Sequence, residues 1–541
     1  MSRRSGIKLM TIASLLCIVA LYFLGVLRSS CNEVEWDAKE GVYETLPKDI
    51  STEEPLAHIG ENFLVDEGFH SNLPIVILKI DGEVTQYKDF MNSQEIIYED
   101  VEPYTDGEIL VLDNSNPEKE NYLTDSPVYT SNMKIKKRGH TSYYYDKPQY
   151  LMKMFDDNGL ENKTEILGMG EGDSWILNGS MADKSMMRNY LSYRIASEVG
   201  GSAMAPDCKY CEVLLETESG YEYQGVYLLM ETVARGENRV NIDKSKDGES
   251  YTSYIVRRDR FTNFDVMLDT YGRLSGLSQE WIGVKYPTAQ KITEEMQQYI
   301  ENDFSRTEQI IYSEDEGVFK AYDKYIDVDS FVDYFLINEF FGNYDAGEHS
   351  TYMYKNSGGR LYIGPVWDFD QAMNNYYADE MEASTLAFQT KPFFEQLSKD
   401  TRFINCLKER YSELRKGPLS EEHVFAVMDE TKQYLTSARE REWYRWAEDY
   451  LDDSFSSMYN YYLQDYIVDD VTISRFNDNY DQELYIIRNY LHKHGNAIQS
   501  ELTKLYDLAE FNSSLKNENE LFLLVIMVLF LVPSILINRK G

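Results

Sequence analysis

Residues Asp333 to Asp370 read DYFLINEFFGNYDAGEHSTYMYKNSGGRLYIGPVWDFD, and this stretch decides how the chain around it folds. Its apolar beginning continues a segment with helical periodicity, so the sequence predicts a helix from Asp327 to Phe341. Gly342 and Asn343 are residues that end helices. We therefore expect Asp345, in the small and polar segment that follows, to lie in a loop.

The second half of the same stretch has the pattern of a β-hairpin. Tyr352-Met-Tyr354 and Leu361-Tyr-Ile363 read as short strands, and Asn356-Ser-Gly-Gly359 between them reads as a turn. A hairpin folds the chain back on itself. We therefore expect Asp345 and Asp368 to lie near each other, although 23 positions separate them.

Two acidic residues at the ends of a hairpin are typical of a magnesium site. Mg²⁺ takes one or two carboxylates and completes its shell with water and phosphate oxygens. Protein kinases use one Asp near the attacking hydroxyl and a second, at a strand end, to hold the metal. The alternative interpretation of Asp345 and Asp368 is a polar turn beside the buried Trp367.

Composition and charge limit the classes of function. The chain has 541 residues, with 92 acidic against 53 basic residues and a net charge of −39. That length allows two or three domains. The negative charge argues against nucleic acid as a partner and favours a basic one. Five cysteines are too few for a disulfide-dense scaffold.

Two apolar segments near the ends predict the compartment. Leu9 to Leu27 carries no charge and follows basic residues, and Leu521 to Ile537 is uncharged and precedes Arg539 and Lys540. Such lengths and flanks predict two transmembrane helices with both ends in the cytoplasm. The main domain would then lie outside the cytoplasm, anchored to the cell membrane. A cleaved signal peptide or a buried core helix is the alternative.

Two basic residues lie in sequence patterns that are typical of phosphate-binding sites. Arg138 ends a predicted strand before the turn Gly139-His-Thr-Ser142, and Lys153 alternates with apolar residues on the next strand. Such a turn directs backbone N–H groups and a guanidinium at a phosphate. Kinases hold nucleotide phosphates with a lysine from a strand. A basic surface strand remains the alternative.

Further polar residues lie on a predicted helix and a predicted strand. Asp183 is a good N-cap for a helix that ends at Gly200, with Arg188 in its first turns. Glu231 ends the apolar strand Gly225-Val-Tyr-Leu-Leu-Met, where an acidic residue is unusual and indicates a role at a cleft. The alternative for Glu231 is a salt bridge to Arg188 or Arg239.

Taken together, these blocks resemble the spore-coat CotH family of atypical protein kinases. Five segments follow the order of that family, from 138–153 and 183–200 through 225–242 and 334–354 to 364–370. The resemblance covers about residues 130 to 375. It implies a divergent kinase-like fold that binds ATP with Mg²⁺ and phosphorylates Ser or Thr in a protein substrate.

The same resemblance implies roles for individual residues. Asp345 would act on the attacking hydroxyl, and Asp368, assisted by Asp370, would hold the metal. The ATP site would comprise Arg138, Lys153, Arg188 and Glu231. One position departs from the family, since Ser350 stands where an Asn often provides a second metal ligand.

Two functions are therefore compatible with the sequence. The first is a membrane-anchored atypical Ser/Thr kinase that phosphorylates envelope or spore-coat-type proteins, with a basic, Ser-rich substrate favoured by the net charge. The second is a non-catalytic envelope or coat scaffold that retains the fold. The expected fold class is α+β, a kinase-like core with a C-terminal helical region, flanked by transmembrane helices.

The chain divides into five predicted parts. We expect a membrane anchor at 1–31, an acidic lead-in at 32–72, the kinase-like core at 73–391, a helical region at 392–518 and a second membrane helix at 519–541.

Cys208 and Cys211 begin a predicted strand, where side chains three apart point to opposite faces. We expect them to be incidental and not bridged.

Overall fold

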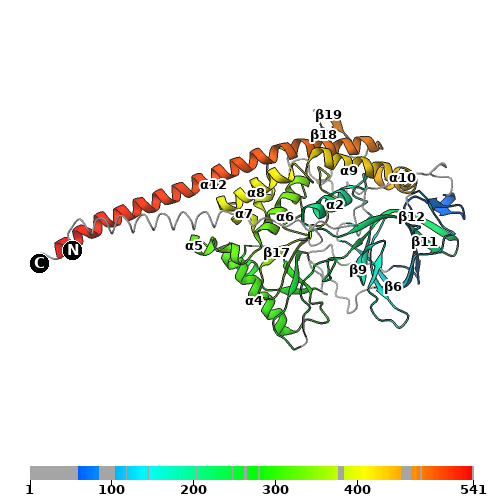
Figure 1. Ribbon diagram of the computed structural model, residues 1–541, viewed down its shortest axis with the longest axis horizontal. Helices are drawn as coiled ribbons and strands as arrows, with labels where there is room; N and C mark the ends of the chain where they lie inside the picture. The colour runs from blue at the N-terminus through cyan, green and yellow to red at the C-terminus, as the bar shows by residue number, and fades with distance from the viewer. Residues whose placement is uncertain are drawn as a thin grey trace.

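A computed structural model of the chain describes residues 59–538 except 85–103, 117, 140–141, 143–144, 180, 201–203, 247, 261–264, 278–280, 376–382, 452–464, 469–470 and 475–477. Side chains are described as far as residue 515. Within these ranges the chain is a mixed α+β structure. A strand-rich part lies at one end, and long helices run along one side (Figure 1).

The strand-rich part contains a closed β-barrel of seven strands. They are β3 (Ile75–Ile80), β4 (Thr105–Leu112), β6 (Tyr129–Arg138), β7 (Gln149–Phe155), β10 (Ser174–Asn178), β11 (Cys208–Thr217) and β12 (Gly220–Glu231). The order around the barrel is β12-β10-β7-β6-β4-β3-β11, and β11 pairs again with β12. Neighbours are antiparallel except β3 and β11, which are parallel. The short β1 (Leu64–Val65) extends the sheet beside β12.

The inside of the barrel is a small apolar core. Alternate side chains of a strand point to opposite faces, so each strand contributes every second residue to the interior. The buried residues Val76, Ile109, Met133, Met152, Trp175, Cys211 and Leu229 represent the seven strands in this core. Odd-numbered residues of β6 and even-numbered residues of β7 point into the barrel, so Arg138 and Lys153 lie on its outer face.

Two helices form the centre of the larger core next to the barrel. α2 (Arg188–Gly200) and α6 (Val328–Phe341) are buried along almost their whole length. α6 is apolar on nearly all sides, and such a helix belongs in an interior. Asp327 caps the start of α6 by accepting a hydrogen bond from the Ser330 N–H, and Gly342 ends it in the left-handed conformation. The predicted helix is thus confirmed.

A second, five-stranded sheet carries the predicted hairpin. Its order is β14 (Val266–Leu268), β15 (Trp281–Tyr286), β13 (Tyr254–Asp259), β16 (Thr351–Lys355) and β17 (Leu361–Ile363). All its neighbouring strands are antiparallel. The hairpin of β16 and β17 confirms the prediction, and β13 lies directly beside it.

The C-terminal helices pack against this core. They are α8 (Thr401–Leu414), α9 (Glu421–Tyr434), α10 (Thr436–Leu451) and α12 (Tyr480–Asn538). α12 runs along α8, α6 and α9 and then extends beyond the body (Figure 1). Apolar residues of α2, α6, α8 and α12 belong to one continuous buried cluster. The residues on either side of position 391 therefore share a core, while the predicted domain boundaries stay predictions.

α10 attaches this helical region to the barrel through buried charges. Lys147 and Glu442 are both fully buried, with 2.6 Å between Nζ and Oε1. Arg441 contacts Glu212 of β11 at 2.6 Å. A buried charge is tolerated when it is paired and hydrogen-bonded. The two pairs fix α10 on the outer surface of the barrel.

The remaining described elements are short or peripheral. They are η1 (Glu61–Phe63), β2 (His70–Ser71), β5 (Asn121–Tyr122), β8 (Thr164–Ile166), β9 (Met169–Gly172), α3 (Tyr271–Leu274), α4 (Glu294–Ile311), α5 (Glu316–Phe319), η4 (Tyr322–Lys324), η5 (Phe388–Thr390), α7 (Phe394–Leu397), β18 (Tyr466–Val468) and β19 (Val471–Ile473). Cys208 and Cys211 are buried and not joined in a disulfide, as expected.

No helix within the described residues is both long and apolar enough to cross a membrane. Leu9 to Leu27 lies outside the described residues, and so do the side chains of Leu521 to Ile537. The two transmembrane spans and the location at the cell membrane therefore stay predictions.

Candidate active site

The loop after α6 positions Asp345. Its carbonyl oxygen accepts a hydrogen bond from the His349 N–H at 2.8 Å, which closes a tight turn. Arg258 of β13 donates to the Gly347 carbonyl at 2.9 Å, and the Gly347 N–H donates to Thr351 Oγ1 at 2.7 Å. The loop is therefore fixed from both strands that flank it.

The segment after β17 positions Asp368. Its backbone is left-handed, with φ of +64°, a conformation in which a non-glycine residue is uncommon and strained. The Asp368 N–H donates to Tyr193 Oη at 3.1 Å, and the next N–H, of Phe369, donates to Asn189 Oδ1 at 2.7 Å. Two side chains of α2 thus hold the strained residue in place.

The structure brings the two predicted aspartates together, as the hairpin suggested. Asn343, next to the Asp345 loop, donates to the Trp367 carbonyl at 3.0 Å. From the other end of that loop, Ser350 Oγ donates to an Asp368 carboxylate oxygen at 3.3 Å. The two segments are therefore joined by direct hydrogen bonds from residues on either side of Asp345.

The charged side chains in this cluster shift one another's pKa values. Burial raises the pKa of Asp368 to about 6, Asp345 adds to the increase, and Arg138 opposes it. Burial and the charge of Asp368 raise the pKa of Asp370 well above its ordinary value. The pKa of Asp345 is also raised by burial, against the opposing charge of Arg260. Three half-buried carboxylates thus lie in one region.

Arg138 is the predicted cation that the structure places in this region. It acts electrostatically on Asp368 and Asp370. Its Nη1 donates to Gln149 Oε1 at 2.7 Å, and its guanidinium lies 5.9 Å from the centre of the Trp367 ring. Arg138 therefore connects the end of the barrel strand β6 with the segment that carries Asp368.

Lys153 lies on the same barrel face but further along it. Arg138 is opposite Gln149 in the β6–β7 register, and Lys134 is opposite Lys153. Residues opposite each other in a ladder project to the same face, so Lys153 shares the outer face with Arg138. Arg138 and Lys134 are four residues apart on β6, so Lys153 lies about 13 Å further along the barrel than Arg138, at 3.3 Å per residue. Lys153 Nζ lies 4.7 Å from the Tyr104 ring centre.

Arg188 and Glu231 make their contacts inside the protein. Arg188 is fully buried, with Nη1 2.5 Å from Asp183 and Nε donating to the Ala372 carbonyl at 3.0 Å. Glu231 is also buried and accepts a hydrogen bond from the Asp207 N–H at 2.9 Å. Arg239 lies 3.5 Å from it, the salt bridge that the sequence offered as an alternative. Roles in ATP binding stay predictions for both.

Sequence reasoning missed a group at the end of β13. Asp259 acts on both Asp345 and Asp368, and Arg260 acts on Asp345. Asp259 is the last residue of β13 and Arg260 follows it, and no motif in the sequence assigned this strand to the site. The missing information is tertiary, because β13 reaches the site by pairing with β16, where Arg258 is opposite Thr351.

The aspartates fit a magnesium ion that is shared with a phosphate-bearing ligand. Within the described residues, no three His, Cys, Asp or Glu side chains form a cluster able to hold a metal alone. Mg²⁺ in phosphate-transfer sites needs only one or two carboxylates, with phosphate oxygens and water as the other ligands. Burial and the charge of Asp368 raise the pKa of Asp370, and a divalent cation would relieve the repulsion between the two carboxylates.

These features define the class of protein: a closed barrel and a helical core that meet at a half-buried cluster of aspartates beside an arginine. The chain belongs to the CotH kinase family, because the sequence model described as CotH kinase protein matches residues 135–498, more than half of the chain. The family expected from the sequence is thus confirmed.

A curated relative is the inner spore coat protein H of Bacillus subtilis (strain 168). It is 27% identical over 215 residues, which are 39% of this chain and 54% of the relative. The chain thus spans about half the length of the curated relative that it matches. The five segments named above all lie within the residues that the family model matches.

Proposed function

We propose that the chain is an atypical protein kinase that transfers phosphate from Mg²⁺-bound ATP to Ser or Thr hydroxyls. The observation that supports this most directly is the convergence of Asp345, Asp368 and Arg138, which come from a loop, a strand end and the barrel. The name of the family supports an ATP-dependent phosphotransferase. The identity of the substrate and the anchoring are further parts of the proposal.

In this proposal Asp345 serves the attacking hydroxyl. The hydroxyl oxygen forms a bond to the γ-phosphorus of ATP, and the bond from that phosphorus to the β,γ-bridging oxygen breaks. ADP leaves with the electron pair of the broken bond, and the hydroxyl proton passes to a carboxylate oxygen of Asp345. The raised pKa of Asp345 suits a proton acceptor, since a more basic carboxylate holds the proton better.

The other residues neutralise and position the phosphates. Asp368 and Asp370 would hold Mg²⁺, whose charge neutralises the phosphate oxygens. Arg138 would contact the transferred phosphate, and Lys153, further along the barrel face, would contact the rest of the triphosphate. Phosphoryl transfer depends on positioning and charge more than on covalent chemistry by the protein.

Arg188 fits a different task from the one the resemblance implied. Its guanidinium is turned to Asp183 and to the Ala372 carbonyl, two residues after Asp370. We propose that it positions the metal-binding segment and does not touch ATP. Its neighbour Asn189 supports the same segment through Phe369.

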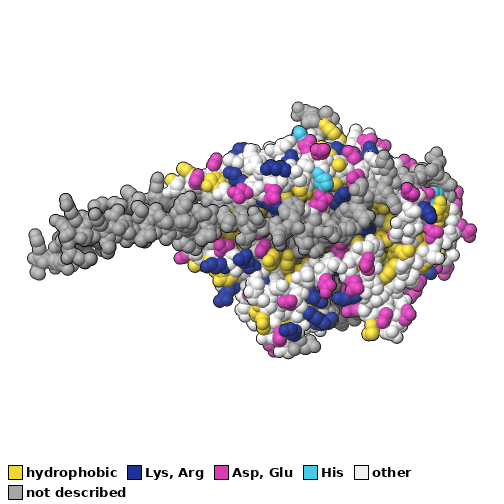
Figure 2. Space-filling view, in the orientation of Figure 1, with side chains coloured by type: hydrophobic (Ala, Val, Ile, Leu, Met, Phe, Trp, Pro, Cys, Tyr) yellow, Lys and Arg dark blue, Asp and Glu magenta, His cyan; other side chains and the backbone are white. Residues whose placement is uncertain are grey.

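For the substrate we propose a basic, Ser-rich protein of the envelope or of a spore coat. The net charge of −39 supports this choice. Acidic side chains are spread over the visible face of the molecule and do not gather in one patch (Figure 2). We also propose that Leu9 to Leu27 and Leu521 to Ile537 anchor the chain in the cell membrane.

A non-catalytic scaffold is the second candidate. The observation in its favour is Ser350, which stands where an Asn is expected and donates its hydroxyl to Asp368. Serine is a poorer metal ligand than asparagine, so a site for two metal ions lacks one ligand here. Binding of coat or envelope proteins without nucleotide would be the activity of such a scaffold.

The test is phosphate transfer by the purified full chain. The chain is incubated with γ-labelled ATP, Mg²⁺ and a basic Ser-containing peptide, next to the same peptide with Ala at each Ser. We expect label in the Ser peptide with wild type and at least a hundredfold less with Asp345→Asn, as expected for loss of a general base. Equal labelling by wild type and Asp345→Asn would contradict the proposed role of Asp345. Partner binding without any transfer would favour the scaffold.

A further inference from the structure

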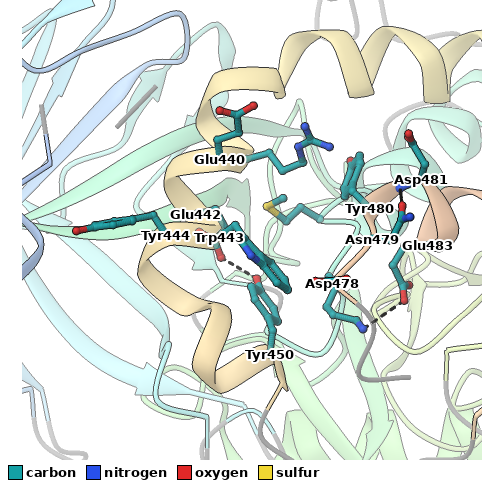
Figure 3. Close-up of a pocket in the computed structure, with 13 residues that line it drawn as sticks. Glu440, Glu442, Trp443, Tyr444, Tyr450, Asp478, Asn479, Tyr480, Asp481 and Glu483 are labelled. Carbon is teal, nitrogen blue, oxygen red and sulfur yellow. Dashed lines mark hydrogen bonds and ion pairs between the residues drawn. The ribbon is translucent and has the colours of Figure 1, made fainter. Parts of the chain in front are cut away.

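A second group of functional side chains lines a pocket that the proposed kinase mechanism does not use. The pocket has a volume of about 620 Å³. It lies between α10, the segment Asp478–Glu483 at the start of α12, and the turn that contains Lys184 and Met186 (Figure 3). Ligand sites for small molecules have volumes of this order.

Aromatic rings form the walls of this pocket. Trp443 and Tyr450 stack with 5.8 Å between ring centres and 5° between ring planes. They lie on the α10 side, with Tyr480 on the side of α12 (Figure 3). Tyr450 Oη donates to Glu442 at 2.7 Å, and Tyr480 Oη donates to the Ser185 carbonyl at 3.0 Å. The rings are therefore held in place before any ligand arrives.

Five carboxylates accompany the rings. Three of them are paired with lysines: Glu442 with Lys147, Asp481 with Lys432 and Glu483 with Lys184. The other two, Glu440 and Asp478, are exposed, and neither makes an ion pair or hydrogen bond with any residue in the described ranges. The pocket thus offers aromatic faces together with two carboxylates that are available to a ligand.

The pocket wall already binds one cation in this way. The guanidinium of Arg439 lies 4.3 Å from the centre of the Tyr480 ring. A guanidinium or ammonium group is attracted to the face of an aromatic ring, most strongly to that of Trp. Trp443 and Tyr450 provide two further rings for such a contact, and Arg439 shows that a cation can lie against a ring of this pocket.

We infer that this pocket is a binding site for an organic cation, an ammonium or guanidinium group that packs against Trp443 and Tyr450 in a pocket that the carboxylates of Glu440 and Asp478 also line. The carboxylates favour a ligand with a positive charge. The aromatic rings favour a weakly hydrated cation that is planar or carries apolar carbon next to its charge. An anion is rejected by the same carboxylates. The site is separate from the nucleotide site, so the inference does not require the chain to be a kinase.

The pocket is nevertheless close to the aspartate cluster. Asp183 acts electrostatically on Asp370 on one side and on Tyr450 and Tyr480 on the other. The turn that begins at Asp183 forms part of the pocket through Lys184 and Met186. A bound cation would therefore contact the turn whose Asp183 holds Arg188.

The test compares a guanidinium with its neutral isostere. The purified full chain is titrated calorimetrically with N-acetylarginine amide and with N-acetylcitrulline amide, which have the same shape and differ in charge. We expect the arginine compound to bind at least about tenfold more tightly, as cation–π and ion-pair contacts together predict. Equal binding of the two compounds, or binding of neither, would overturn the inference.

Two variants show whether that binding occurs in this pocket. The double variant Glu440→Gln, Asp478→Asn should weaken the arginine compound about 3- to 10-fold and leave the citrulline compound unchanged. The matched control Glu409→Gln, Asp507→Asn removes the same charge from exposed positions on α8 and α12. Equal affinities in the two double variants would overturn the assignment to this pocket.

A further titration identifies the source of the cation. Agmatine is a free amine with a guanidinium group, whereas N-acetylarginine amide represents a side chain of a partner protein. Tighter binding of agmatine supports a small-molecule amine as the ligand, and tighter binding of the arginine compound supports a protein side chain. Trp443→Leu should weaken whichever compound binds, because it removes the ring with the strongest cation attraction.

Discussion

Replacing Arg188 by Met tests whether this residue supports the aspartate cluster from inside. The side chain is fully buried, forms an ion pair with Asp183 and donates a hydrogen bond to the Ala372 carbonyl, with longer contacts to Ser185 and Glu483. Removing one partner of a buried pair typically costs about 3–5 kcal/mol. Asp183 keeps hydrogen bonds from Ser185 and from the backbone N–H of residue 188, so the lower value applies.

The lost hydrogen bond to Ala372 adds about 1 kcal/mol. We therefore expect Arg188→Met to lower the free energy of unfolding by about 4 kcal/mol. Urea unfolding followed by circular dichroism measures this quantity. The affinity for Mg²⁺-ATP should fall as well, because the segment after Asp370 loses its support.

Arg194→Met is the matched control on the same helix. Arg194 lies 3.6 Å from Glu198 and 3.2 Å from Glu430, and both of these carboxylates are partly exposed. Arg194 is itself buried, but its partners are partly screened by solvent, so we expect its loss to cost less than the loss of Arg188. An Arg188→Met variant as stable as Arg194→Met, with ATP affinity alone reduced, would refute the reasoning and restore Arg188 as a nucleotide ligand.

Three further predictions follow from the burial and charge of particular residues. Lys147→Met and Glu442→Gln should each lower the free energy of unfolding by about 3–5 kcal/mol, and the double variant by less than their sum, in urea unfolding. Asp368 has a pKa raised to about 6, so the metal-free folded state binds its proton more tightly than the unfolded state does. Stability of the metal-free chain should therefore fall as pH rises from about 4 to about 6, and Asp368→Asn should flatten that slope in unfolding measured at each pH. Gly342→Ala should cost about 1–2 kcal/mol in thermal or urea unfolding, because Gly342 has φ of +61° and its Cβ would meet Tyr490.

Local sequence patterns were sufficient for the hairpin and the helix before it. Gly342 had to be a left-handed helix end, and the turn Asn356 to Gly359 had to reverse the chain. These two features bring the segments that carry Asp345 and Asp368 to the same end of the hairpin. The family resemblance then depended on short blocks with fixed spacing, which survive in sequence even where the fold around them is not predictable.

Tertiary pairing accounts for what the sequence did not reveal. The closed barrel needs β3 to pair in parallel with β11, and no local pattern indicates a partner more than a hundred residues away. Asp259 enters the site because β13 lies beside β16. The burial of Arg188 depends equally on Asp183 and Ala372, since an arginine in the first turns of a helix looks the same whether it faces a ligand or the interior.

The most direct test of the kinase account is ATP binding by the purified full chain, with and without Mg²⁺, for wild type and Asp368→Ala. The account predicts that wild type binds ATP more tightly with Mg²⁺ and that the variant loses this Mg²⁺ dependence while it remains folded. Absence of ATP binding by a well-folded wild type, or the same Mg²⁺-dependent binding by Asp368→Ala, would contradict it.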